Sequence, residues 1–268
     1  MLIFTGSLLG LLIGSVLGLT GAGGGIFAVP ALVFGLGMSI RDAAPVALLA
    51  VGSAALLGAL QGLRQGIVRY KAAALLAAAG AFTAPLGVRL AHQFPAWWLN
   101  LVFVIIMLVV AGRMFMASIQ PETDIEPATL KAKPCQVSDE TGRFVWGVRI
   151  AITLGTIGAV TGLFTGLLGV GGGFIIVPAL AYASNLRMHS IVATSLMVIA
   201  LLSAVTIFSA WGQGVLLSGP TYAFALASLV GMALGRLMAP SISSRMLQRF
   251  FSIICVVVAL MMLMRHVA

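Results

Sequence analysis

Apolar residues follow one another in long runs along this chain, and polar residues gather in the short stretches between them. The main runs lie at 1–19, 43–63, 72–90, 97–112, 191–211 and 250–264. Most of them approach the ~20 residues that a helix needs to span a bilayer. The first run has no basic residues before it, so we expect a retained helix and not a cleaved signal peptide. The pattern predicts an all-α membrane protein with several spanning helices.

Two of the apolar stretches contain the same glycine-rich motif. Gly21–Leu32 reads GAGGGIFAVPAL, and Gly169–Leu180, 148 positions later, reads GVGGGFIIVPAL. The same offset relates Gln65-Gly66-Ile67 to Gln213-Gly214-Val215. This internal similarity predicts a duplicated chain, with repeat one at residues 1–120 and repeat two at residues 147–268.

The segment between the repeats, residues 121–146, differs from the rest of the chain in its polarity. It holds five of the six acidic residues. These are Glu122, Asp124, Glu126, Asp139 and Glu140. Proline and charge disfavour a packed core, so we expect a solvated linker that is partly disordered and lies on the cytoplasmic side.

Composition agrees with a membrane location. Hydrophobic residues make up 61% of the chain and charged residues 8%, whereas a soluble domain carries roughly a quarter charged residues. The net charge of +9 comes from single basic residues in loops, with no aromatic-interleaved basic stretch typical of a nucleic-acid site. The lipid bilayer is therefore an expected partner, and nucleic acid is not.

The distribution of basic residues predicts how the repeats are oriented. If the Arg64–Lys71 loop is cytoplasmic, helix-by-helix counting places twelve of the fifteen Lys and Arg residues inside. Only Arg41, Arg89 and Arg265 then lie outside. Because cytoplasmic loops carry an excess of Lys and Arg, we expect two inverted-topology repeats with both termini outside.

That orientation requires each glycine motif to break a helix. In repeat one, residues 2–36 must begin and end on the same face of the membrane. A helix to residue 19, a break, and a short segment at 26–36 satisfy this. Eleven helical residues rise only ~16 Å, about half of the ~30 Å core. We expect about three full helices, a further helix and a glycine-broken half-helix in each repeat, or 8–10 segments in total. Pro30 and Pro178 are the expected hinges, and the sequence leaves open whether these segments cross the membrane fully.

The breaks also predict a binding site. Glycines free consecutive N–H groups to point at one ligand, and a helix that begins there adds its positive dipole end. Two such breaks would form an anion site, completed by hydroxyl groups. The candidate residues are Thr20, Gly21, Gly23, Gly24, Gly25, Gly169, Gly171, Gly172, Gly173, Thr194 and Ser195. The alternative is that these glycines only let helices pack closely.

Several kinds of chemistry are missing from the pattern. No Asp or Glu lies inside an expected span, which disfavours a carboxylate proton relay and a cationic substrate. We find no metal-ligand spacing, no nucleotide-binding motif and no catalytic constellation. We therefore expect no metal, no cofactor and no enzymatic activity, but a small anionic substrate and a possible homo-oligomer.

These motifs together resemble a known family. Gly14–Leu32, Gly162–Leu180, the segment Ala193-Thr194-Ser195-Leu196 and the repeated Gln-Gly turns resemble the TauE/SafE sulfite exporter family, also named TSUP. One position departs from the pattern: Val46-Ala47 stands where family members often have Thr-Ser, so the first repeat contributes fewer hydroxyl groups.

The resemblance implies a multi-pass permease of the bacterial inner membrane that carries sulfite, sulfoacetate or related sulfur-containing anions by secondary transport. It also implies that the glycine motifs and Thr194-Ser195 form the core of the transport path. We expect alternating access between the two faces. An uptake permease for another small organic anion, a passive anion channel and a membrane-embedded accessory protein of sulfur metabolism remain alternatives. The anion, the direction, the coupling ion and the oligomeric state stay open.

Overall fold

The protein is described by a computed structural model over residues 2–21, 24–119, 135, 147–211, 219–238 and 244–267. The first half contains α1 (Leu2–Thr20), the 3₁₀ turn η1 (Gly24–Phe27), α2 (Ala28–Gly35), α3 (Ile40–Arg64), α4 (Tyr70–Gln93) and α5 (Ala96–Ile119). The second half contains α7 (Val148–Leu168), α8 (Gly173–Ala183), α9 (Met188–Trp211), α10 (Gly219–Met238) and α11 (Ser244–Val267).

The predicted all-α membrane fold is confirmed. Within the described ranges, seven helices are long and apolar enough to cross a membrane. The helices that follow the glycine motifs are short, with 8 residues in α2 and 11 in α8. At 1.5 Å per residue, both are far shorter than the ~30 Å apolar core of a bilayer.

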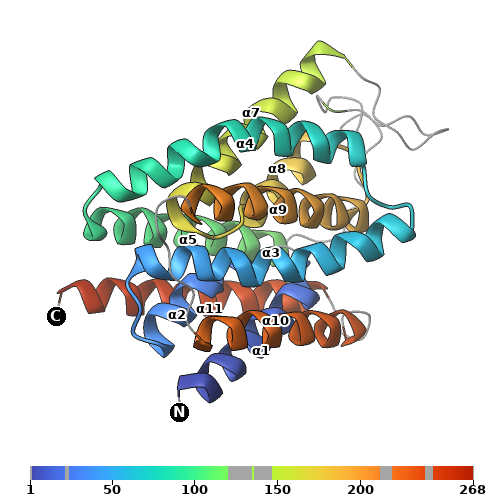
Figure 1. Ribbon diagram of the computed structural model, residues 1–268. Coiled ribbons are helices and arrows are strands. Elements are labelled where there is room, and N and C mark those ends of the chain that lie inside the picture. Colours follow the sequence, from blue (N-terminus) through green and yellow to red (C-terminus); the bar gives the residue numbers. More distant parts are fainter. Residues whose placement is uncertain are drawn as a thin grey trace.

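The two halves use the same order of elements. A shift of 148 positions takes α1 to α7, η1 and α2 to α8, α3 to α9, α4 to α10, and α5 to α11. The packing partners exchange under the same shift, because α1 packs on α10 while α7 packs on α4. In Figure 1, α3 and α9 lie in the middle of the molecule, between the α4–α7 pair and the α1–α10 pair.

Glycines determine the close α1–α10 and α4–α7 contacts. They recur every four residues at Gly10, Gly14 and Gly18 of α1 and at Gly158, Gly162 and Gly166 of α7. A Cβ at Gly14 would collide with the carbonyl group of Ser228 on α10. A Cβ at Gly162 would collide with the carbonyl group of Gly80 on α4, which is the equivalent contact. Small residues let membrane helices approach at backbone distance, and that packing explains this glycine spacing.

The contacts also define the relative directions of equivalent helices. Gly62 of α3 approaches Ala193 of α9, whereas Gly52 approaches Ser203, so α3 and α9 are antiparallel. The hydrogen bonds between α5 and α11 follow the same antiparallel order. By contrast, α1 is parallel to α10 and α4 is parallel to α7. Antiparallel equivalents are the arrangement that an inverted repeat requires.

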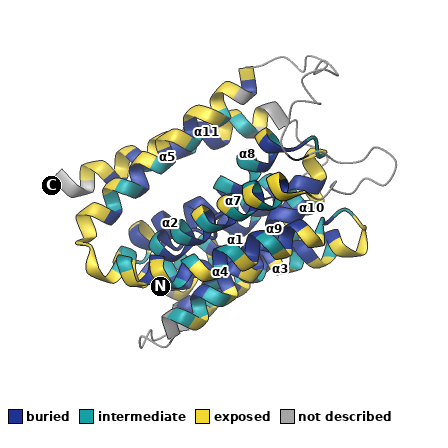
Figure 2. Cartoon of the chain, turned by 90° about the horizontal axis from the view of Figure 1, so that it is seen from above, coloured by how far each residue is buried: buried dark blue, intermediate teal, exposed yellow. Residues whose placement is uncertain are grey.

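Burial divides the helices into a centre and a periphery. The spanning windows of α3 and α9 are 67% and 61% buried, against 28–39% for the other spans in the described ranges. Figure 2 shows the exposed residues on the outer faces of the bundle and the α5–α11 pair at its edge. The centre of the fold is therefore the α3–α9 pair, against which both glycine breaks lie.

The linker contributes one described residue, Cys135. Its side chain is fully buried, and its N–H donates to the Ala183 carbonyl oxygen at 2.9 Å, at the end of α8. We had expected a solvated linker, but this point of it is packed against the second half-helix. Burial raises the pKa of the Cys135 thiol, which keeps it protonated and slow to react.

Candidate functional site

The first glycine break joins α1 to η1. α1 ends at Thr20, Gly21 follows with φ +78°, and the next helical turn starts at Gly24. The Thr20 hydroxyl accepts a hydrogen bond from the Gly24 N–H at 3.0 Å and donates to the Val16 carbonyl oxygen at 2.8 Å. The Gly24 N–H and the Thr20 hydroxyl were both expected to bind the anion, but here they bond to each other. Gly23, also a predicted site residue, lies outside the described residues.

The second break joins α7 to α8 and is built differently. Gly169, Gly171 and Gly172 have φ values of +72°, +74° and +72°. This left-handed region suits glycine, because a Cβ there meets the following carbonyl oxygen. The residue equivalent to Thr20 is Leu168, so no hydroxyl group is present at that position to take up the N–H donors.

Backbone donors at the second break are left unpaired. Within the described part of the chain, the N–H groups of Gly171, Gly172, Gly173 and Phe174 make no hydrogen bond. All four residues are buried. The first N–H groups of a helix lack partners inside that helix, but buried backbone donors without any partner are rare in folded proteins. Four in sequence indicate a place for an acceptor.

The two breaks meet near the middle of the molecule. The Cβ position of Gly25 lies 3.0 Å from the Val170 carbonyl oxygen and 3.0 Å from Cγ1 of Val51. The Cβ position of Gly171 lies 3.3 Å from the same Val51 atom and 3.1 Å from Cγ2 of Ile199. Val51 and Ile199 are each the twelfth residue of α3 and α9, which have 25 and 24 residues. The breaks are thus at mid-depth of the central helices, as in transporters with broken helices.

Three buried hydroxyl-bearing residues lie beside the second break, and sequence reasoning missed all of them; Thr161 and Thr165 donate their hydroxyls to carbonyl oxygens of α7. Thr161 and Thr165 of α7 contact Gly172, whose Cβ position lies 2.7 Å from the Thr165 Oγ1. Ser203 of α9 places its Oγ 3.8 Å from the Cβ position of Gly171. Ser203 is 1% exposed and its Oγ has no hydrogen-bond partner. The spacing of Thr161 and Thr165, one helical turn apart before the break, was the available signal.

Thr194 and Ser195 lie elsewhere on α9. The Thr194 Oγ1 accepts a hydrogen bond from the backbone N–H of Arg69 at 3.0 Å, which connects α9 to the start of α4. The Ser195 Oγ donates to the Val192 carbonyl oxygen at 2.8 Å. Thr194 is nine residues before Ser203, or about 13 Å along the helix axis. The structure therefore places Ser203, and not Thr194, beside the second glycine break.

The two prolines lie inside the short helices. Pro30 is the third residue of α2 and Pro178 the sixth residue of α8. A proline near the start of a helix removes no hydrogen bond, whereas one further along does. A hinge role fits Pro178 better than Pro30 on this ground, and it remains a prediction for both.

The electrostatics of the site come from dipoles. The side chains that contact the breaks are apolar or carry hydroxyl groups. Asp42, exposed at the start of α3, is the sole carboxylate among the described residues. No group of three His, Cys, Asp or Glu residues in the described ranges could hold a metal ion. Unpaired N–H groups at the start of α8 give this buried region a partial positive charge that suits an anion.

The fold and these breaks define a multi-pass bacterial membrane transporter. The family described as "Sulfite exporter TauE/SafE" matches residues 7–262. The chain belongs to this family, as its motifs had indicated.

Relatives with a similar chain carry transporter names. A "Probable membrane transporter protein" of Xylella fastidiosa (strain 9a5c) is 26% identical over 257 residues, which cover 95% of this chain and 92% of the relative. The "Probable membrane transporter protein YjnA" of Bacillus subtilis (strain 168) is 26% identical over 199 residues, covering 70% and 71%. No solved structure shows a significant match to the chain.

Proposed function

We propose that this protein is a secondary transporter of small sulfur-containing anions of the sulfite and organosulfonate class. The anion binds at the N–H groups of the second glycine break, where the Ser203 hydroxyl, which has no hydrogen-bond partner, completes the site. The observation that carries the proposal is the run of buried N–H groups from Gly171 to Phe174, which find no hydrogen-bond partner among the described residues, beside the unpaired Ser203 hydroxyl.

The energetics favour a ligand at this place. Leaving a buried polar group without a partner costs roughly 1–3 kcal/mol. Several such groups in one region would destabilise the empty protein, and an oxyanion with several acceptor oxygens would satisfy them together. Sulfite and sulfonate groups each present three oxygens on one sulfur atom, which suits a set of convergent donors.

The site is one-sided in its chemistry. The positions equivalent to Thr161, Thr165 and Ser203 in the first half are Ile13, Leu17 and Ala55. The Gly24 N–H is bonded to Thr20. We therefore modify the symmetric two-break site expected from the sequence: the second half supplies most of the polar contacts, and the first half supplies an apolar wall through Val51.

The substrate class rests on the family. TauE/SafE proteins are described as sulfite exporters, and neutral dipoles without a nearby carboxylate disfavour cations. Inverted halves that pack around a mid-depth site support alternating access by movement of one half against the other. Other small organic anions, and either direction of transport, fit the same site.

Counterflow in proteoliposomes tests the proposal. Vesicles loaded with unlabelled sulfite should take up external radiolabelled sulfite in a transient overshoot that saturates with concentration. Vesicles loaded with chloride should show no overshoot. A flux that rises linearly without overshoot would indicate a channel. Overshoot driven only by a carboxylate would move the substrate class away from sulfur anions.

A further inference from the structure

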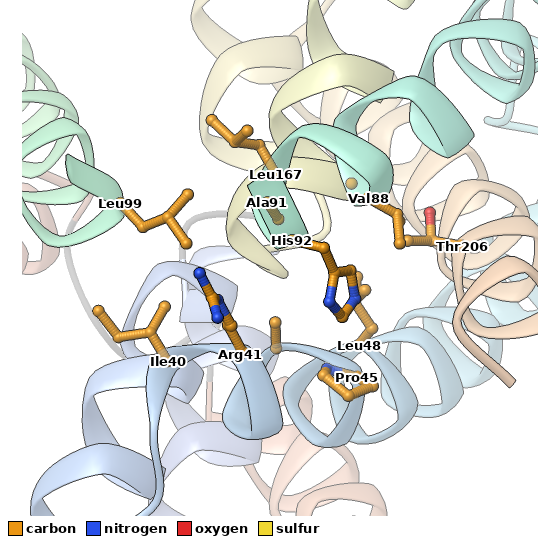
Figure 3. Close-up of a pocket in the computed structure, with 12 residues that line it drawn as sticks. Ile40, Arg41, Pro45, Leu48, Val88, Ala91, His92, Leu99, Leu167 and Thr206 are labelled. Carbon is orange, nitrogen blue, oxygen red and sulfur yellow. The ribbon is translucent and has the colours of Figure 1, made fainter. Parts of the chain in front are cut away.

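A pocket opens where α3 begins and α4 ends. Its volume is about 40 Å³, room for about three water molecules. Figure 3 shows Arg41 entering it from α3 and His92 from α4, with Leu99, Leu167 and Thr206 around them. No carboxylate is among its lining residues. Arg41 Nη2 donates to the Phe94 carbonyl oxygen at 2.6 Å, which holds the guanidinium at the rim.

The pocket adjoins the second glycine break. Ala44 lines the pocket, and its carbonyl oxygen lies 2.8 Å from the Cβ position of Gly169. Thr206, on another wall, is three residues beyond Ser203 on α9. The pocket and the break therefore adjoin the same parts of α7 and α9, since Thr206 and Ser203 are about one helical turn apart along α9.

At the equivalent place in the other half, the described residues include an arginine that bonds to a neighbouring helix. The 148-residue shift takes pocket residues Val88 and Thr206 to Arg236 and Gly58. Arg236 Nη1 donates to the Gly58 carbonyl oxygen at 2.8 Å and to Gln61 Oε1 at 2.7 Å. These hydrogen bonds join the end of α10 to the end of α3, at the opposite end of α3 from the pocket.

Further side chains lie at the same place. The Cβ position of Gly58 lies 2.6 Å from Met232 Cε, 2.8 Å from Leu196 Cδ1 and 3.4 Å from Arg236 Nη1. Leu196 is the equivalent of Leu48, which lines the open pocket. Among the described residues at this second end, Arg236, Met232 and Leu196 thus pack together around Gly58.

We propose that the Arg41 pocket is the access vestibule for the transported anion, and that Arg236 is the latch that closes the equivalent path at the other end of α3. The inference rests on the proposed function, since it assigns the two paths to the site at the second break. The Arg41 guanidinium attracts anions into the vestibule. Opening the other path requires Arg236 to release Gly58 and Gln61.

A matched cysteine pair tests the latch. In a Cys135→Ser, Cys255→Ala background, we compare Leu48→Cys with Leu196→Cys in detergent, where both faces meet an anionic methanethiosulfonate reagent. Both leucines are buried, but Leu48 lines the pocket and its shortening to cysteine widens it, so Leu48→Cys should be labelled faster than Leu196→Cys. Adding Arg236→Met should expose Leu196→Cys and slow the labelling of Leu48→Cys. Equal labelling of the pair, or a pattern that Arg236→Met leaves unchanged, would refute the latch.

Transport kinetics test the vestibule. Arg41→Gln should raise the KM for the transported anion roughly fivefold to tenfold with a smaller change in kcat, because the charge acts on capture. Arg41→Lys should restore most of the affinity. Arg89→Gln is the control, since Arg89 is exposed near the same end of α4 but does not line the pocket. Equal KM values for Arg41→Gln and Arg89→Gln would refute the vestibule.

The two assays separate this inference from the proposed function. Labelling reports the open and closed paths without any substrate, so it decides the latch even where no sulfur anion is transported. If wild-type protein transports no sulfur anion but labels as expected, the proposed substrate fails and the latch stands. If sulfite counterflow is present but labelling is symmetric, the substrate stands and the latch fails.

Discussion

Buried serines in this protein differ in whether their hydroxyl groups are bonded. The Ser228 Oγ donates to the Ala50 carbonyl oxygen at 3.1 Å, and the Ser252 Oγ donates to the Ala111 carbonyl oxygen at 2.9 Å. Both connect separate helices. Ser203 is as deeply buried as these, but its hydroxyl has no partner and lies beside the second glycine break. A stabilising role therefore explains Ser228 and Ser252, whereas Ser203 is better explained by ligand binding.

Ser203→Ala should separate stability from binding. Removing an unpaired buried hydroxyl should leave the melting temperature unchanged or raise stability by up to ~1 kcal/mol. Anion affinity should fall about tenfold, the equivalent of ~1.4 kcal/mol. Ser252→Ala should behave oppositely, with lower stability and unchanged affinity. Thermal unfolding and equilibrium binding on both variants check this. A loss of stability in Ser203→Ala without a loss of affinity would make Ser203 a structural residue.

At the level of helices, glycine has two separate tasks here. Four glycines of the breaks (Gly21, Gly169, Gly171 and Gly172) adopt left-handed backbone conformations. The glycines spaced by four along α1 and α7 are helical and sit against the backbones of α10 and α4. The close-packing alternative that the sequence allowed concerned the motif glycines, whereas the structure shows such packing at the second group. Gly172 meets both conditions: its backbone is left-handed, and a Cβ there would also collide with Thr161.

Gly162→Val should destabilise the α4–α7 pair. The valine side chain would collide with the Gly80 carbonyl group and push α4 away from α7, at a cost of about 1–3 kcal/mol or more. Gly155→Val is the control on the same helix, because a Cβ at Gly155 meets no atom within 4 Å. Melting temperatures in detergent check the pair. Equal destabilisation by both substitutions would attribute the effect to valine in α7 and not to the helix contact.

At the scale of the whole molecule, the packing supports the proposed inverted repeats. Equivalent helices α3 and α9 are antiparallel, as are α5 and α11, while partners exchange between halves. The charge distribution predicts the direction, with the Arg64–Lys71 loop inside and both termini outside. Packing alone does not distinguish this orientation from its reverse.

A pair of cysteines tests the orientation. Gln65→Cys and Gln213→Cys occupy equivalent positions in the two halves. In intact cells, an impermeant thiol reagent should label Gln213→Cys and spare Gln65→Cys until the membrane is permeabilised. The opposite pattern would reverse the topology, and labelling of both from outside would contradict inverted repeats.

The sequence predicted the parts of this structure that depend on local chemistry. Long apolar runs, the repeated motif and the short helices after each break follow from composition and from the glycines at 21–25 and 169–173. The Ser203 and Thr165 positions were not predicted, because their closeness to Gly171 and Gly172 depends on how α7 and α9 pack across the break. For the same reason, the bond from Arg69 to Thr194 was invisible in the sequence.

The measurement that tests the central claim most directly is ligand-dependent thermal unfolding of the purified protein. The panel contains sulfite, sulfate, thiosulfate, sulfoacetate, taurine and acetate at fixed ionic strength. Binding to the folded state adds RT ln(1 + [L]/Kd), or ~2.7 kcal/mol at 100 Kd. We predict saturable stabilisation by a sulfur anion, reduced in Ser203→Ala. Stabilisation by none of the anions, or equal stabilisation of both proteins, would contradict an anion site at the second glycine break.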